Sequence, residues 1–431
     1  MRNLCLTIMG WLAVTVMAQP TAREWNESVT AGWNLGNQLE CPPSGQDNGS
    51  VAIGNPANAL SAETAWGNPR VTQQTMQAVR DAGFNAVRIP VRWQHHISDA
   101  TTMTIDEEWL QRVKQIVGYA LDLGMKVIIN THHEQWLESR PTYTYNDENN
   151  RCLRLLWTQI ATAFKDYGYE LAFAGTNEVH VPNNWNAPTA ENQTVQNAYN
   201  QTFVDAVRAT GGQNLQRHLI VQTYNTNIGY GLSGFVVPTD IDGNNNRYMS
   251  VEVHYYTPWE YCGTNTYYYW GQQYKQYGPI SSYDEQAMIA EFQQMAQAWG
   301  QQGLGIVIGE WGVTDHYTTA GRKAIIHENM SYFCKTLVSE ARQRGFSTFV
   351  WDNNAFGNGD DKFGIFDRWN QMTLTADWIV RGIMDGVATG IAPLAATRQN
   401  NHSACLMMDK GRVVVVCGDR RYSLTGVELK D

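Results

Sequence analysis

Two glutamates, far apart in the chain, end or follow apolar segments and could act as a pair. Glu178 follows the segment 170–176, and Glu310 ends the segment 304–310. Two facing carboxyl groups can cleave a glycosidic bond, with retention when they are about 5–5.5 Å apart and with inversion at roughly 6.5–9.5 Å. The sequence does not fix this distance, so both outcomes stay open. Either glutamate alone could equally be half of a buried ion pair with Arg88.

Further polar and aromatic residues stand at the ends of other apolar segments, where they could surround such a pair. We expect the following to bind substrate: Asn37, Arg88, His132, His133, Asn177, His254, Tyr256, Trp259, Trp311 and Trp351. A cationic Arg88 would hold Glu310 ionised, and the charge of Glu310 would keep Glu178 protonated.

Three of these residues have more specific expected roles. Tyr256 could donate a hydrogen bond to Glu310 and orient it. Trp351 would offer an indole face to the reacting sugar, and Asn177 a hydrogen bond to its 2-hydroxyl group. These contacts would support glycosidic cleavage at the glutamate pair.

The histidines also raise the alternative of a metal site. His132 and His133 are adjacent, and neighbouring residues on a strand point to opposite faces, so they cannot easily share an ion, even with His254. The cysteines form no CxxC pair. We therefore expect no metal and no cofactor.

Aromatic residues make up 11% of the chain, with 16 Trp and 21 Tyr, whereas charged residues make up 17%. Flat apolar faces with polar rims suit the C–H faces of sugar rings, although large cores also use such residues. Five tryptophans lie in or beside loops that could line a cleft: Trp66, Trp136, Trp185, Trp259 and Trp311.

Eight short β-rich segments alternate with helical segments along the chain. The expected strands cover 30–36, 85–91, 125–131, 170–176, 218–223, 248–256, 304–310 and 346–352. The expected helices cover 71–82, 106–123, 147–167, 191–210, 284–302, 321–344 and 373–384, and the link 228–237 is the weakest. Eight alternations predict an α/β fold of the closed (β/α)8 TIM-barrel type, in which the carboxyl ends of the strands form one working face.

The two ends of the chain differ from this pattern. Residues 1–18 have a basic start, a short apolar run and small residues before a cleavage site, as in a signal peptide. We therefore expect a secreted, extracellular or cell-surface protein, with a catalytic domain at 19–390. Residues 391–431 are expected to form a small C-terminal β-rich appendage of unknown role.

The charge and hydropathy of the chain narrow the class of partner. A net charge of -10 without a basic stripe disfavours nucleic acid. No segment approaches the roughly 20 apolar residues of a membrane span. The first strand is not followed by GxGxxG, which argues against a dinucleotide site. We expect a monomer that acts on a neutral polysaccharide.

Ordered motifs over roughly residues 25–387 resemble glycoside hydrolase family 5, closest to its subfamily 4 of endo-β-1,4-glucanases and xyloglucanases. The motifs are GWNLGN at 32–37, WGNP at 66–69, GFNAVRIPV at 83–91, NTHH at 130–133, NE at 177–178, HYY at 254–256, GEWG at 309–312 and WD at 351–352. The resemblance implies a retaining enzyme on β-1,4-linked glucan, with Glu178 as acid/base and Glu310 as nucleophile. Val179 and His180 depart from the family pattern beside the acid/base, which bears on substrate preference.

Two alternatives differ from this expectation. An endo-β-1,4-mannanase on the same scaffold would need only to accept an axial 2-hydroxyl group. A barrel that binds carbohydrate without cleaving it would have no use for Glu178, Glu310 and Arg88 together.

Overall fold

The computed structural model describes most of the chain. The described ranges are 19–54, 59–184, 186–243, 245–316, 321–357 and 359–390, with four further strands between 404 and 429. The expected signal peptide at 1–18 and Trp185 lie outside them.

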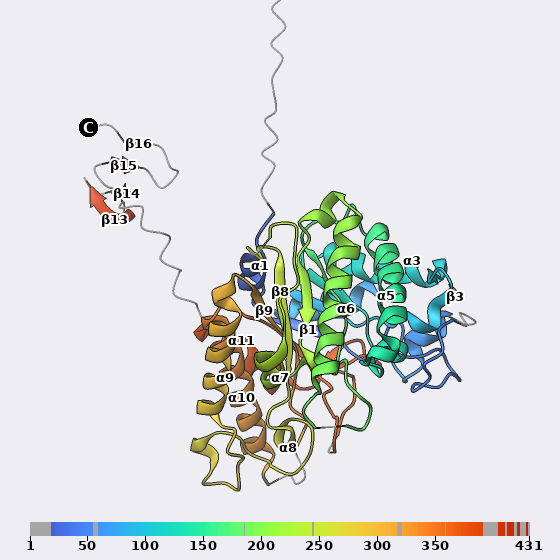
Figure 1. Ribbon diagram of the computed structural model, residues 1–431. Coiled ribbons are helices and arrows are strands. Elements are labelled where there is room, and N and C mark those ends of the chain that lie inside the picture. Colours follow the sequence, from blue (N-terminus) through green and yellow to red (C-terminus); the bar gives the residue numbers. More distant parts are fainter. Residues whose placement is uncertain are drawn as a thin grey trace, which may run out of the picture. The chain divides into compact units, whose positions relative to one another are not determined.

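Eight parallel strands close into a barrel (Figure 1). They are β1 (Gly32–Leu35), β2 (Ala86–Ile89), β5 (Lys126–Asn130), β6 (Leu171–Ala174), β7 (Leu219–Gln222), β8 (Met249–Tyr255), β9 (Gly305–Trp311) and β10 (Ser347–Asp352). Each lies inside one of the segments expected from the sequence, apart from one residue of β9. Strand β1 pairs with both β2 and β10, which closes the ring. The predicted (β/α)8 fold is confirmed.

Helices cover the outside of the barrel. They are α2 (Gln73–Asp81), α3 (Glu107–Leu121), α5 (Tyr143–Ala163), α6 (Ala190–Ala209), α7 (Ile228–Gly234), α9 (Glu285–Ala298), α10 (Lys323–Gln343) and α11 (Asp377–Thr389). Figure 1 shows α5 and α6 side by side on one flank and α9, α10 and α11 on the other. The weak link contains α7, whose first turn is capped by the side chain of Asn227.

The predicted boundary of the last helix is wrong. Residues 373–374 form β12 (Thr373–Leu374), which pairs with β11 (Phe366–Asp367), and α11 begins only at Asp377. The sequence analysis therefore extended the helix into a small β-hairpin.

The barrel interior forms a core of its own, separate from the core between strands and helices. Small residues such as Ala86 and Ala172 leave room there for Ile128 and Phe349. Trp25 joins this core from α1 (Ala22–Ser28), a helix that the sequence analysis did not predict and that contacts β8 and β9. The filled interior makes the barrel a rigid support for side chains at its strand ends.

Short elements decorate the connecting loops. They are β3 (Ile97–Asp99), β4 (Thr104–Ile105), α4 (Gln135–Glu138), α8 (Trp259–Cys262) and the 3-10 helices Ala59–Thr64, Gln94–His96, Gly212–Leu215, Tyr224–Thr226, Gln272–Tyr274 and Gly300–Gln302. Several lie in loops that follow a barrel strand, so they shape the working face.

The chain divides into two compact units, with the boundary between Gly390 and Ile391. The second unit contains an antiparallel sheet of β13 (Ala404–Asp409), β14 (Arg412–Cys417), β15 (Arg420–Tyr422) and β16 (Glu428–Leu429). The β-rich character predicted for the C-terminal residues is thus confirmed. Among the described residues, no helix is both long and apolar enough to cross a membrane.

Candidate active site

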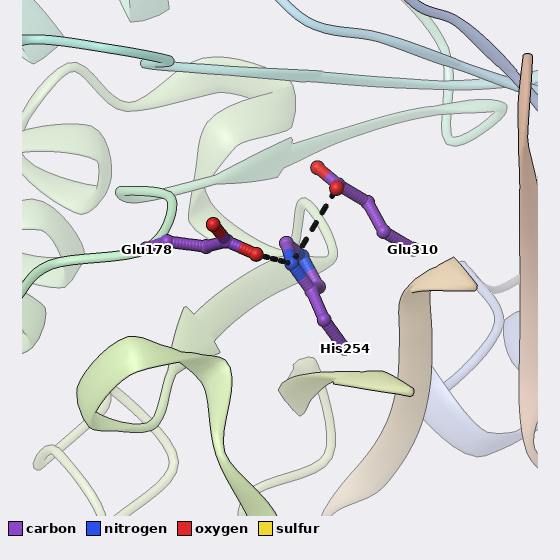
Figure 2. A group of neighbouring side chains, drawn as sticks. All are labelled: Glu178, His254 and Glu310. Carbon is purple, nitrogen blue, oxygen red and sulfur yellow. Dashed lines mark hydrogen bonds and ion pairs between the residues drawn. The ribbon is translucent and has the colours of Figure 1, made fainter. Parts of the chain in front are cut away.

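The barrel brings the two predicted glutamates together. Glu310 lies on β9 and pairs in register with His254 on β8, and Glu178 follows β6. One oxygen of each carboxylate and one ring nitrogen of His254 all lie within 4.8 Å of one another. Figure 2 shows the imidazole between the two carboxylates. This approach of the two carboxylates is close to the short spacing of a retaining pair.

Arg88 on β2 ties this pair to the barrel interior. Its Nη1 donates to Glu310 Oε1 at 2.7 Å and to Asn34 Oδ1 at 3.0 Å, and its Nη2 donates to Asn177 Oδ1 at 2.8 Å. Its Nε lies 3.1 Å from Glu252 Oε1. The guanidinium is fully buried, so these contacts replace its hydration and fix Glu310 in one orientation.

His254 is held as a cation between carboxylates. Its Nδ1 lies 2.6 Å from Glu178 Oε1 and 3.6 Å from Glu310 Oε2, and its Nε2 lies 3.3 Å from Glu252 Oε1. Burial alone would lower the pKa of His254, but the charge of Glu310 and the hydrogen bonds to Glu178 and Glu252 raise it to about 9. An imidazolium has no lone pair to offer, so a metal ion at this cluster would first have to displace the proton of His254.

The pKa shifts of the two glutamates run in the directions opposite to those expected from the sequence. Burial raises the pKa of Glu178, but the hydrogen bond and charge of His254 outweigh this and hold it below its ordinary value. Burial raises the pKa of Glu310 above its ordinary value, although His254 and Arg88 oppose the rise. The sequence analysis had assigned the proton to Glu178 and the firmly held charge to Glu310, because it did not foresee that His254 bonds to Glu178.

Other predicted side chains gather around the pair. Tyr256 donates to Glu310 Oε2 at 3.3 Å, as expected. Asn177 Nδ2 lies 3.3 Å from His132 Nε2, and burial lowers the pKa of His132 far enough to keep it neutral. The ring of Trp351 lies nearly parallel to that of His132, 6.1 Å between centroids and 12° between planes. The indole also lies against Gly36, where a Cβ would approach it to 2.7 Å, so only glycine leaves it room there.

Two predicted residues form the rim of the site rather than its centre. Asn37 and His133 have backbone φ angles of 56° and 57°, in the left-handed region that residues other than glycine rarely adopt. The backbone of Asn37 bonds to the side chains of Glu40 and Asn68. The ring of His133 lies between those of His132 and Trp66, at 4.4 and 6.0 Å.

The tryptophans expected at the cleft separate by exposure. Trp66 is 36% exposed and Trp259 48%, so each offers a face to solvent. Trp136 and Trp311 are 3% and 1% exposed. The proposed substrate role of Trp311 is therefore corrected, because the residue after Glu310 turns its indole into the core, where it has no face for a sugar.

Sequence reasoning missed Asn34 and Glu252, although both touch Arg88. They lie inside β1 and β8 rather than at strand ends. Glu252 could have been predicted from the alternation of side chains along a strand, because Glu252 and His254 are two residues apart on β8 and so share one face. Burial raises the pKa of Glu252, but the charges of Arg88 and His254 keep it below its ordinary value.

The chain is similar to known glycoside hydrolases in sequence and in structure. The model of the cellulase family, glycosyl hydrolase family 5, matches residues 51–357. Endoglucanase A of Paenibacillus barcinonensis is 34% identical over 88% of this chain and 94% of its own length. Cellulase/esterase CelE of Acetivibrio thermocellus is 34% identical over 89% of this chain, which spans only 42% of that longer protein. The structure of the Bacteroides ovatus GH5 xyloglucanase with a XXXG heptasaccharide has a TM-score of 0.77 and 31% identity, and the match covers 86% of this chain and 78% of that one.

Proposed function

Because the chain belongs to the cellulase family, glycosyl hydrolase family 5, we propose that it hydrolyses internal β-1,4-glucosidic bonds by double displacement, with Glu310 as nucleophile and Glu178 as acid/base. The observation that carries this proposal is the approach of Glu178, His254 and Glu310 to within 4.8 Å of one another. This approach is close to the spacing of a retaining pair, in which the sugar carbon lies between the two carboxylates.

In the first step, a carboxylate oxygen of Glu310 forms a bond to the anomeric carbon as the glycosidic bond breaks. Glu178 transfers a proton to the leaving oxygen, and the product is a glycosyl ester on Glu310. Arg88 and Tyr256 orient the attacking carboxylate, at 2.7 and 3.3 Å. His254, bonded to Glu178 at 2.6 Å, can supply Glu178 with this proton before the bond breaks, through their hydrogen bond.

In the second step, Glu178 takes a proton from water, whose oxygen attacks the anomeric carbon and releases Glu310. The ester has removed the negative charge of Glu310, so the pKa of Glu178 falls and the group can act as a base. The configuration of the sugar is retained because two inversions occur at the same carbon.

The substrate that suits the site is a β-1,4-glucan backbone, as in cellulose, mixed-linkage glucan or xyloglucan. Trp66 and Trp259 leave exposed faces for neutral sugar rings, and the net charge of -10 disfavours acidic polymers. The similar Bacteroides ovatus enzyme is a xyloglucanase, and its structure holds a xyloglucan heptasaccharide. Asn177, whose Oδ1 accepts a hydrogen bond from Arg88, would bond an equatorial 2-hydroxyl group.

A panel of polymers tests the proposed function. Purified protein should release reducing sugar from barley glucan, xyloglucan and soluble cellulose, and much less from galactomannan. Galactomannan as the best substrate would replace the proposal with a mannanase. Binding of these polymers in a gel without any release of sugar would identify a non-catalytic barrel. Nuclear magnetic resonance of the first product should show the β-anomer.

The cellular location and oligomeric state belong to the same proposal. Residues 1–18 have the pattern of an export signal, and a polymer such as xyloglucan is met outside the cell. We expect the mature chain to begin near residue 19 and to act as a monomer. Amino-terminal sequencing of the exported protein and its mass by light scattering check both points.

A further inference from the structure

Trp369 is the most exposed large apolar side chain among the described residues, at 69%. It follows β11 in the hairpin between β11 and β12, within the connection from β10 to α11. A single exposed apolar side chain needs no explanation by itself. The contacts that hold the indole of Trp369 in place do need an explanation.

The indole is fixed although it is exposed. Its Nε1 donates to the carbonyl oxygen of Gly67 at 2.7 Å, and its backbone N–H donates to Asp367 Oδ1 at 3.1 Å. The preceding Arg368 is buried and donates from Nη1 to the carbonyl oxygen of Gly36 at 2.7 Å. The ring thus remains in one place without being covered by the protein.

The loop that accepts this hydrogen bond is itself tied to the working face of the barrel. Asn68 donates from Nδ2 to the carbonyl oxygen of Asn37 at 2.6 Å. Asn354, three residues after Trp351, donates from Nδ2 to Asn68 Oδ1 at 2.8 Å. Gly67 lies in the loop that follows β1, and Trp369 lies in the connection that follows β10. These hydrogen bonds hold the two segments together.

A series of rings leads from the reacting centre to this point. Trp351 lies 6.1 Å from His132, His132 lies 4.4 Å from His133, and His133 lies 6.0 Å from Trp66. Gly67, the residue after Trp66, then accepts the hydrogen bond of Trp369. Trp66 and Trp369 are both exposed, at 36% and 69%, so the series ends in two open indole faces.

We propose that Trp369, together with Trp66, forms a distal subsite that binds a glucosyl unit of the chain beyond the units held at the cleavage site. The proposal rests on the proposed function. An indole fixed before the ligand arrives stacks on a sugar ring at little cost in side-chain entropy, and neutral sugars suit it better than charged ligands do. The Nε1–Gly67 bond uses the polar edge of the ring and leaves its faces for the sugar.

Steady-state kinetics on long and short substrates test the subsite. The readout is the ratio of kcat/KM on cellohexaose to kcat/KM on an aryl β-cellobioside. The aryl cellobioside is too short to reach the distal subsite, whereas cellohexaose can reach it. Trp369→Ala should lower this ratio about tenfold, which corresponds to ~1.4 kcal/mol of lost binding. Trp66→Ala should lower the same ratio and gives a second test should Trp369→Ala fold poorly.

Trp369→Phe separates stacking from anchoring, because phenylalanine keeps a flat face and loses the donor to Gly67. If the ring stacks on sugar, this variant retains most of the ratio. If Trp369 only anchors the hairpin, Trp369→Phe is as damaging as Trp369→Ala, and the subsite is refuted. Tyr169→Ala is the matched control. Tyr169 is 42% exposed, but it precedes β6 and so lies at the opposite end of the barrel. The ratio of the two kcat/KM values should be the same for Tyr169→Ala as for wild type.

Failure of the subsite and failure of the proposed function give different results. Equal losses on both substrates, or no loss on either, with an active wild-type enzyme would overturn the subsite alone. A wild-type protein that cleaves no β-1,4-glucan would overturn the proposed function and the subsite with it.

Discussion

At the scale of single residues, His254 opposes the effect of burial on the pKa of each of the three carboxyl groups around it. It and Arg88 are the two cations that face Glu178, Glu252 and Glu310, so one net negative charge remains when all three carboxylates are ionised. The cluster therefore takes up one proton readily. The Glu178 side chain is 38% exposed, and a bound sugar chain that covers it would raise its pKa toward the protonated form that the first step needs.

The raised pKa of His254 predicts a pH dependence of stability. A pKa of about 9 in the folded state, against 6.5 ordinarily, stabilises the fold by about 3 kcal/mol. This contribution is complete below pH 6.5 and is lost as the pH rises through 9. Urea unfolding should therefore show a larger difference between wild type and His254→Gln at pH 6 than at pH 9.5.

His95→Gln is the control for this measurement. Burial lowers the pKa of His95 to about 4, so His95 is neutral in the folded state but takes up a proton in the unfolded state below about pH 6.5. The difference between His95→Gln and wild type should therefore change by only about 1 kcal/mol between pH 6 and pH 9.5, and in the opposite direction to that of His254→Gln. A pH-independent difference for His254→Gln would contradict the assigned charge of His254.

The role of Glu178 predicts a dependence on the leaving group. Glu178→Ala should lower kcat/KM on β-glucan by roughly 10²–10⁴, the usual contribution of a general acid. Release of 2,4-dinitrophenol from its β-cellobioside should be nearly unaffected in the first turnover, because that leaving group needs no proton. Burst kinetics measure this step, and equal losses on both substrates would show that Glu178 is not the acid.

The sequence was informative about the candidate site where polar side chains lie at or near the ends of strands. Arg88, His254, Tyr256 and Glu310 could be found because polar groups interrupt apolar strands there. The directions of the pKa shifts of Glu178 and Glu310 could not be predicted, since they depend on which carboxylate lies nearest to His254, at 2.6 Å. Trp369 was also missed, because its hydrogen bond to Gly67 joins parts of the chain that no local pattern connects.

At the scale of elements, closure of the barrel depends on close packing of β1 against β10. A Cβ added to Gly32 would lie 2.3 Å from the ring of Phe349 and 2.6 Å from the carbonyl oxygen of Thr348. The ring of Phe349 fills the barrel interior and the carbonyl belongs to the backbone, so neither can move freely. This one glycine therefore sets the distance between the first and last strands.

Gly32→Ala should destabilise the protein by about 1–3 kcal/mol, the usual cost of overpacking a core. Gly118→Ala is the matched control, because nothing lies within 4 Å of its added Cβ in α3, and it should stabilise by about 0.5–1 kcal/mol. Urea unfolding measures both. A Gly32→Ala variant as stable as wild type would show that β1 and β10 can move to accommodate a Cβ without loss of stability.

The elements could be predicted to different extents for physical reasons. The eight strands are buried on both faces, so their apolar runs identify them. Helix α1 has seven residues, and it depends on a capping box at Thr21 and on burial of Trp25 in the barrel, which only the folded chain provides. The start of α11 was placed too early because β12 forms only by pairing with β11.

At the scale of the whole molecule, the division at Gly390 predicts that the barrel is independent of the C-terminal sheet. Residues 19–390 contain every side chain assigned to the site. A chain that ends at Gly390 should keep the kcat/KM of the full protein on barley glucan and its melting temperature within a few degrees. A loss of activity with an intact melting temperature would instead give residues 391–431 a part in catalysis or substrate binding.

The central claim is that Glu310 becomes covalently bound to sugar while Glu178 lies within reach on the other side of the same bond. Incubation with a 2-deoxy-2-fluoro-β-cellobioside that carries a good leaving group traps such an ester, and peptide mass spectrometry locates it. The account predicts one label per chain, on the peptide that contains Glu310, and none in Glu310→Ala. A label on another residue, or an active enzyme that accumulates no label and yields the α-anomer, would contradict it.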